Sequence, residues 1–429
     1  MNKLYKLTLI GILIIPLSSI FPHLLKIVPK WQFLLGMAGT DVWYIQLIFL
    51  LIFISLGLST VLWKFNKFVS IFTVSCMFST LLMRHQDIRD IMALFVVQCM
   101  CLLAYGISKM TRGQRVNILR AIVLVFIAQS ALVIAQYFNA DPFFDYIGNT
   151  SMDDTVGLVG SHNQVGLFLA DVGPLIVIFY PYFIPILIFC LWCSTTSSAW
   201  AGCIVASLLA AFYIGKRKFV FLFALFLICT GIYVQKFESV TVQTFKERAR
   251  LVEHTVRSVL NEKIVTEVVH SQMGLVKQVI TCNQFFGFGL GKFIRISPRS
   301  EGQYWVVSHD KIIEDKEDTL TGMVPQHRYS HAHNDYAEVF FEMGWFGIIA
   351  LVLCIGDFIR RFIVSKKSKL LIVSFSCVVA HLVTALGIFT VHTAVSGLML
   401  ILFWGITEGE LREVDNGETW WKQGVPKMV

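Results

Sequence analysis

Ionisable side chains are concentrated in one short stretch of an otherwise apolar chain. Residues 327–347 read HRYSHAHNDYAEVFFEMGWFG and include His327, His331 and His333. An imidazole exchanges its proton near neutral pH, so such a cluster is suited to general acid or base catalysis. Two histidines two residues apart fall short of the three convergent protein ligands of a catalytic zinc site. The stretch therefore indicates proton transfer more than metal binding.

The residues that follow these histidines fit the start of a helix. In a helix Asn334, Glu338 and Glu342 would lie four residues apart on one face. Asn334 is suited to cap the first turn, and Asp335 or Glu338 could set the tautomer of His333. A polar helix at a membrane surface, with no catalytic role, explains the same composition, and these residues alone do not decide between the two interpretations.

The elements that must position this stretch are predicted to be membrane helices. Of the 429 residues, 56% are hydrophobic and 15% are charged, and the mean hydropathy is +0.68. A soluble domain is about 45–50% apolar and about 25% charged. The composition excludes a soluble enzyme, a disordered protein and a secreted disulfide scaffold.

A helix needs about 20 mostly apolar residues to cross a bilayer. On that criterion we predict an all-α polytopic membrane protein with about twelve transmembrane helices. The segment 182–193 is the weakest because it is short and contains prolines. The predicted spans are 4–21, 43–63, 68–83, 91–108, 118–137, 164–180, 182–193, 199–214, 219–235, 345–363, 370–388 and 390–408.

The basic residues predict the orientation. Short loops rich in Lys and Arg stay in the cytoplasm, and all such loops fall on one side if both termini are cytoplasmic. The net charge of +8 therefore reflects topology, and we expect no nucleic-acid partner. The residues concerned are Lys3, Lys6, Lys64, Lys67, Lys109, Arg112, Arg115, Arg120, Lys216, Arg217, Lys218, Arg360, Arg361, Lys366, Lys367 and Lys369.

This topology divides the chain into four parts. Residues 1–235 hold the first nine helices, 236–344 form a large and mostly helical external loop, 345–408 hold the last three helices, and 409–429 form a cytoplasmic tail. The external loop holds six of the eleven histidines. Its GxGxG sequence at 287–291 lacks the strand and helix of a dinucleotide site, so we predict a turn where the chain passes close to the bilayer or a ligand.

The stretch HAHNDYAEVFFEMGWFG resembles the signature of the bacterial O-antigen ligase and polymerase superfamily, a His-x-His-Asn sequence followed by an acidic, small-residue tail that enters a membrane helix. Three further segments are similar to family segments and occur in the same order. GSHNQ at 160–164 resembles a Gly/Asn-rich segment that opens a span, TTSSAW at 195–200 resembles Thr-x-Ser-Arg-x-x-Trp, and FGFGLG at 286–291 resembles a glycine turn. The likeness covers about residues 157–347.

The resemblance implies a glycosyltransferase of the bacterial inner membrane that acts on the periplasmic side. Such enzymes transfer a glycan from undecaprenyl pyrophosphate to a hydroxyl of the lipid A core, of another glycan or of a protein, without a metal or other cofactor. His333 corresponds to the family histidine that activates or orients the acceptor. By this likeness the catalytic group comprises His331, His333, Asn334, Asp335 and Glu338.

The chain departs from the family at the arginines that bind pyrophosphate. Ser198 stands at one expected position, and the other falls near Val269 and His270. A diphosphate leaving group still needs cationic partners. We therefore assign the diphosphate to Arg248, Arg250 and Arg257 with His270, although a solvated helix face explains these arginines too, and the loss leaves open a specialised or inactive member. Other predicted substrate contacts are His162, Asn163, Arg328 and Glu342.

Two other functions remain open from the residues. Asp153 and Asp154 form an acidic pair that could bind Mg²⁺ or Mn²⁺ in a metal-dependent glycosyltransferase. Asp171 lies inside a predicted span, and ionisable groups there are typical of transporters and channels. His381 and His392 lie in the last two spans. A structural membrane subunit is the third alternative.

Overall fold

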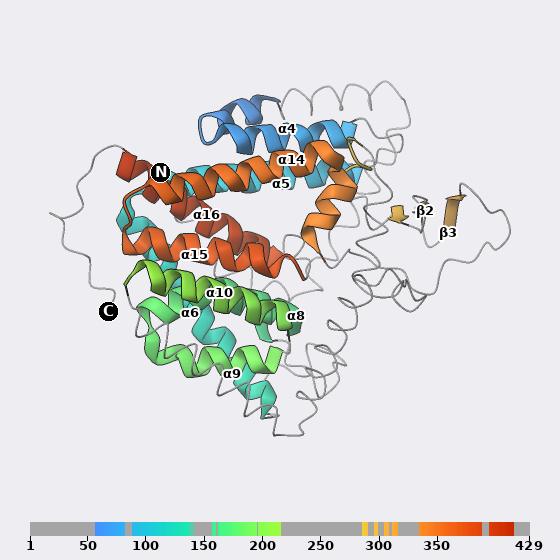
Figure 1. Ribbon diagram of the computed structural model, residues 1–429. Coiled ribbons are helices and arrows are strands. Elements are labelled where there is room, and N and C mark those ends of the chain that lie inside the picture. Colours follow the sequence, from blue (N-terminus) through green and yellow to red (C-terminus); the bar gives the residue numbers. More distant parts are fainter. Residues whose placement is uncertain are drawn as a thin grey trace, which may run out of the picture.

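A computed structural model describes much of the chain. The described residues are 56–81, 88–138, 140, 157–159, 162–194, 196–215, 285–290, 296–298, 304–308, 311–315, 334–387 and 394–415. Most of them belong to a bundle of helices that run side by side (Figure 1). The predicted helical class is therefore confirmed for this part of the chain.

The bundle is built from apolar helices of different lengths. They are α4 (Lys67–Leu81), α5 (Ile88–Ser108), α6 (Arg112–Tyr137), α8 (His162–Phe179), α9 (Ile184–Ser194), α10 (Ser197–Tyr213), α14 (Asp335–Val364), α15 (Lys369–Thr384) and α16 (Ala394–Asp415). Two short 3₁₀ helices, η3 (Gly157–Val159) and η4 (Pro181–Phe183), precede α8 and α9. The segment 56–63 is also helical.

The order of the helices in space differs from their order in the sequence. α4 packs against α14, α5 packs against α16, and α6 and α8 pack against α9. α8, α15 and α16 contact one another, and α10 lies against both α8 and α15 (Figure 1). Helices from both halves of the chain thus share one core.

Small residues allow the central helices to approach closely. A Cβ atom on Gly202 of α10 would lie 2.1 Å from Thr384 Oγ1 and 2.6 Å from the carbonyl oxygen of Ala380 on α15. Only glycine fits at this crossing. Glycine at helix crossings is common in membrane bundles, where close packing and hydrogen bonds replace the hydrophobic effect as the force between helices.

Two of the described helices are long and apolar enough to cross a bilayer. They are α6 and α14. α4, α5, α8, α9, α10 and α15 include shorter apolar stretches. Large apolar side chains point out of the bundle on both long helices, such as Leu124, which is 62% exposed, and Val352, which is 61% exposed.

The predicted apolar segments agree with these helices. Each predicted segment from 68–83 to 199–214, and each from 345–363 to 390–408, coincides with a helix. The segments 4–21 and 219–235 lie outside the described residues, and 43–63 is described only from residue 56. The possible helix at 240–280 also lies outside them.

A small sheet was not predicted. β1 (Ile296–Pro298), β2 (Tyr304–Ser308) and β3 (Lys311–Asp315) form an antiparallel sheet in the order β1-β2-β3. Trp305 pairs with Asp315, and a bulge lies between Val306 and Val307. β2 and β3 are rich in β-branched and aromatic residues, which favour strands. The segment 236–344, predicted to be mostly helical, therefore also contains strands.

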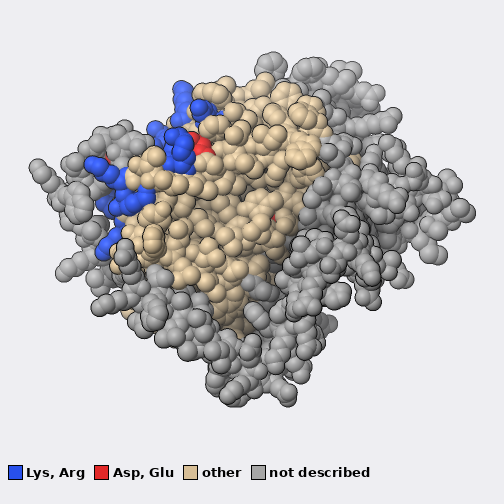
Figure 2. Space-filling view, in the orientation of Figure 1, with Lys and Arg blue, Asp and Glu red and all other residues tan. Residues whose placement is uncertain are grey.

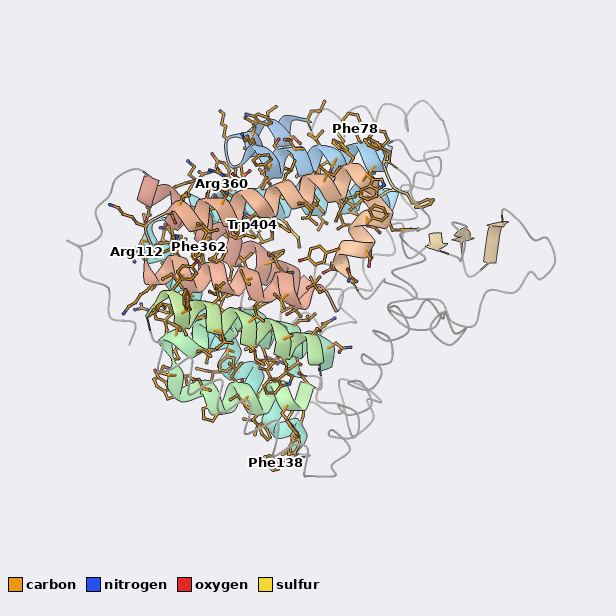
Figure 3. All side chains as sticks on the ribbon, viewed as in Figure 1. Phe78, Arg112, Phe138, Arg360, Phe362 and Trp404 are labelled. Carbon is orange, nitrogen blue, oxygen red and sulfur yellow. The ribbon has the colours of Figure 1, made fainter. Side chains whose placement is uncertain are left out.

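Basic residues gather at one end of the bundle. Figure 2 shows Lys and Arg at the end where α14 finishes and α15 begins. Figure 3 labels Arg112 and Arg360 at this end and Phe78 at the other. Arg412 on α16 donates to the carbonyl oxygen of Phe65, before α4, at 2.8 Å. Arg115 on α6 donates to Glu410 on α16 at 2.9 Å, so these three segments meet at this end. Basic residues from several helices thus gather at one end of the bundle.

A buried ion pair joins two helices at this basic end. Both terminal nitrogens of Arg361 on α14 donate to the carboxylate of Glu408 on α16, at 2.6 and 2.5 Å. Arg361 Nε also donates to Asp357 at 2.8 Å. The Glu408 side chain is completely buried. Such a bidentate contact is among the stronger hydrogen-bonded pairs in proteins.

We expect Arg361→Met to destabilise the protein strongly, because it leaves the Glu408 carboxylate buried without its main partner. The free energy of unfolding should fall by about 3–5 kcal/mol, measured by denaturant titration of the purified protein. Arg360→Met is the matched control: Arg360 pairs with Asp357 but its side chain is 66% exposed, so the loss should stay within about 1 kcal/mol. Equal losses would contradict a special role for the buried pair.

Candidate active site

The predicted motif begins at a helix start that is capped as expected. Asn334 Oδ1 accepts a hydrogen bond from the amide of Ala337 at 3.0 Å. The prediction that Asn334 caps this helix is therefore confirmed. The same side chain has a second role, because its Nδ2 donates to the carbonyl oxygen of Leu386 at 2.8 Å.

The first turn of α14 is attached to the chain at the end of α15 by further hydrogen bonds. The amide of Asp335 donates to the carbonyl oxygen of Ala385 at 3.1 Å, and the Tyr336 hydroxyl donates to that of Leu382 at 2.7 Å. The last carbonyls of a helix lack partners within the helix. The motif supplies those partners, so Asn334, the residue after His333, is held firmly in place.

The acidic residues of the motif are buried. Asp335 is 5% exposed, Glu338 is 1% and Glu342 is 2%. Buried carboxylates require hydrogen-bonding or cationic partners, and all three residues have interactions in the structure. The structure thus places them against the bundle rather than toward open solvent.

α14 bends directly after these residues. Gly344 has φ 63° and ψ −160°, which is not helical. The turn at 285–290 packs on the bend: the amide of Phe288 donates to Phe341 O at 3.0 Å and that of Gly289 donates to Glu342 O at 2.8 Å. Ser79 Oγ on α4 also donates to Glu342 O. Carbonyls released by the bend thus regain partners.

Gly287 is the closest point of this contact. A Cβ atom there would lie 2.4 Å from the carbonyl carbon and oxygen of Glu342 and 2.5 Å from the amide nitrogen of Gly344. Its φ is +72°, a conformation that favours glycine. The predicted turn at this glycine is present, and its close approach is to the backbone of α14. An approach to the bilayer or to a ligand stays a prediction. The rings of Phe288 and Phe341 stack beside the contact with α14, with centroids 4.5 Å apart.

The other two segments that resemble the family also meet. Thr196 Oγ1 donates to Asn163 Oδ1 at 3.1 Å, which joins the start of α10 to the start of α8. Ser198 lies against Gly387, where an added Cβ atom would be 2.9 Å from Ser198 Cβ. Gly387 follows Leu386, which binds Asn334. A continuous set of contacts therefore connects segments that are far apart in the sequence.

Several predicted site residues lie outside the described part of the chain. They are His331, His333, Arg328, Arg248, Arg250, Arg257, His270, Asp153, Asp154 and His392. The backbone of His162 begins α8, while its side chain is not described. Their predicted roles stay predictions. In the residues that the structure does describe, no cluster of three or more His, Cys, Asp or Glu could hold a metal ion.

One polar cluster was missed by sequence reasoning. Asp171 and His381, considered separately as transport residues, are in contact through Asp171 Oδ2 and His381 Nδ1 at 3.1 Å. Ser396 Oγ donates to the same carboxylate oxygen at 3.1 Å and lies 3.3 Å from His381 Nδ1. A nucleophilic serine would bind the opposite ring nitrogen from the carboxylate. This cluster is therefore not a serine hydrolase triad.

We expect Gly287→Ala to destabilise the site end of the bundle because the new methyl group meets the α14 backbone. Gly215→Ala is the matched control: Gly215 has φ +77° and no atom within 4 Å of its added Cβ, so it carries only the backbone strain, about 1–3 kcal/mol. Gly287→Ala should lower the free energy of unfolding by clearly more than this control, as measured by denaturant titration. Equal losses would mean that the contact at the bend has little energetic weight.

Comparisons with known proteins give no family assignment. No protein-family model and no curated protein matches this chain. The interpretation of the site therefore rests on the residues of the motif and on the contacts that bring Asn163, Thr196, Leu386 and Asn334 to one end of the bundle.

Proposed function

We propose that this protein is an integral-membrane glycosyltransferase that transfers a glycan from undecaprenyl pyrophosphate to an acceptor hydroxyl, as O-antigen ligases and polymerases do. The observation that carries the proposal is the convergence of the family-like segments. These segments are far apart in the sequence and comprise the start of α8, the start of α10, the glycine turn and the first half of α14. They are linked in space through contacts of Thr196, Ser198, Gly387 and Gly287.

The proposal includes a membrane topology of about twelve spans with both termini in the cytoplasm of a bacterium. Long apolar helices and outward apolar side chains support it. The distribution of charge supports the orientation: Arg361 lies near the basic end of α14, and Asn334 caps its other end. Basic residues favour the cytoplasmic side, which would leave the candidate site on the periplasmic side of the inner membrane.

The proposed reaction is a displacement at the anomeric carbon of the donor glycan. The acceptor oxygen forms a bond to that carbon, the carbon–oxygen bond to the diphosphate breaks, and undecaprenyl pyrophosphate leaves. His333 takes the acceptor proton. Because a diphosphate is a good leaving group, the main demands on the protein are positioning and charge stabilisation.

The contacts of Asn334, the residue that follows His333, support this role. Asn334 is held by hydrogen bonds in two directions, to Ala337 and to Leu386. A general base must lie within hydrogen-bonding distance of the proton that it takes, so a firmly held neighbour favours this role. The proposed cationic partners of the diphosphate are Arg248, Arg250 and Arg257, with His270 beside them.

The remaining predicted contacts concern the acceptor. We propose that His331, Arg328 and the segment at His162 and Asn163 contact the glycan or the acceptor. The acceptor is the lipid A core, another glycan or a protein hydroxyl. The buried position of Asp171, against His381 and Ser396, accounts for its presence in the bundle, and we base no transport function on it.

His333→Ala should reduce glycan transfer by about 10²–10⁴-fold, because the proposed general base is removed. The measurement is transfer from undecaprenyl-pyrophosphate-linked glycan by the purified protein in lipid. His327→Ala is the matched control, since it removes a histidine from the same stretch but outside the His-x-His-Asn sequence. Both variants should insert into the membrane at normal amounts. Full transfer by His333→Ala would exclude this mechanism.

Transfer should also survive treatment with EDTA, because the proposed mechanism uses side chains and no metal. The rival mechanism places Mg²⁺ or Mn²⁺ at Asp153 and Asp154 and requires the metal for charge stabilisation. Activity that is lost with EDTA and restored by either ion would favour that rival.

A further inference from the structure

The cluster of Asp171, His381 and Ser396 joins the three helices at the centre of the bundle. Asp171 belongs to α8, His381 to α15 and Ser396 to α16. Each of these residues is 1% exposed. Asp171 Oδ2 lies 3.1 Å from His381 Nδ1 and 3.1 Å from Ser396 Oγ, and the latter two atoms are 3.3 Å apart. The three atoms thus form a closed triangle. A polar cluster between buried helices is costly unless its members bind one another.

Hydrogen-bond donors determine how the triangle is arranged. The Ser396 hydroxyl has one proton, which it donates to Asp171 Oδ2. His381 Nδ1 shares a hydrogen bond with the same oxygen at 3.1 Å, whichever of the two atoms carries the proton. Polar groups on two different helices therefore converge on one side-chain oxygen of a third helix. This arrangement fixes the positions of α15 and α16 relative to α8.

The cluster lies one helical turn from the groups that hold the motif. The carbonyl oxygen of His381 accepts from the amide of Ala385 at 2.9 Å. Three carbonyl oxygens that follow it in the chain bind the motif. That of Leu382 accepts from the Tyr336 hydroxyl, that of Ala385 from the amide of Asp335, and that of Leu386 from the Asn334 side chain. A displacement of His381 would therefore be passed through a single turn to the residues beside His333.

The same cluster is connected to the other side of the candidate site. Asp171 is two turns along α8 from Asn163, which binds Thr196 at the start of α10. α8 and α15 both contact α10. Asp171 is thus connected to α10 through α8 and α15, the two helices that pack against α10.

We propose that Asp171, His381 and Ser396 are positioning residues of the candidate active site, acting through the last turn of α15. The inference rests on the proposed function for its kinetic part only. The cluster does not touch the substrate. It holds Leu386 and Ala385 where they bind Asn334 and Asp335, the two residues that follow His333 in the sequence.

The test compares Ser396→Ala with a matched control, Ser374→Ala. Ser374 on α15 accepts a hydrogen bond from Thr407 of α16 at 2.9 Å, so the control removes a buried hydroxyl contact between the same two helices, farther from the motif. The full-length protein in lipid is examined by hydrogen exchange of peptides that contain Asp335 and Ala337. Steady-state transfer kinetics are measured on the same samples.

We expect Ser396→Ala to raise the exchange rate at the start of α14 about tenfold, because the loss of one hydrogen bond loosens the turn that holds it. The kcat for glycan transfer should fall about tenfold with KM within about twofold, since misplaced catalytic groups affect the transition state more than binding. Ser374→Ala should change neither quantity. Ser396→Thr keeps the hydroxyl and should retain both wild-type values.

The two readouts separate the inference from the proposed function. Faster exchange in Ser396→Ala from a protein that transfers no glycan would support the positioning role and reject the glycosyltransferase. Unchanged exchange and unchanged kcat in a protein that does transfer glycan would overturn the inference. Equal effects of Ser374→Ala would also overturn it. If Ser396→Ala does not fold, Ser396→Cys, with a weaker donor, should show the same changes to a smaller extent.

Discussion

Carbonyl oxygens at the end of a helix have no partner within that helix, and in this protein the first turn of α14 supplies partners for those at the end of α15. The Asn334 side chain donates to the carbonyl oxygen of Leu386, the amide of Asp335 to that of Ala385, and the Tyr336 hydroxyl to that of Leu382. In an apolar bundle, where water is scarce, unpaired carbonyls are costly. This junction therefore stabilises the fold and places the motif at the same time, and the rest of the candidate site is arranged around it.

The bend in α14 extends this arrangement to the large loop. Because Gly344 departs from helical geometry, the carbonyls before it need partners from elsewhere. The turn at 285–290 and Ser79 supply them. The contact is short enough to require glycine at position 287. The turn at 285–290 is thus bound to α14 by backbone hydrogen bonds. Because these bonds use backbone atoms, side-chain substitutions elsewhere in the turn would leave them intact.

The two ends of the bundle use polar groups differently. At the basic end, Arg361 and Arg115 form buried ion pairs with Glu408 and Glu410 of α16. Nearer the motif, the central helices are joined by Asp171, whose partners are a histidine and a serine. Ion pairs thus hold α6 and α14 to α16 at one end, and hydrogen-bonded groups hold α8, α15 and α16 together nearer the other.

Local patterns in the sequence were sufficient for the helices and for several details of the site. Runs of apolar residues predicted the segments that coincide with the described helices, because burial and hydrogen bonding within each helix depend on neighbouring residues. The capping role of Asn334 and the presence of a turn at Gly287 followed from residue type. The sheet at 296–315 was missed, since its three strands are short and separated by turns.

Tertiary structure alone decided which of these features meet. Residue type could indicate that Gly287 approaches something closely, but only packing shows that it approaches the backbone of α14. Asp171, His381 and Ser396 are far apart in the sequence, and their contact depends on how α8, α15 and α16 are placed. Spacing along one helix reports which face a residue occupies, whereas the partner of that face depends on the packing of all the helices together.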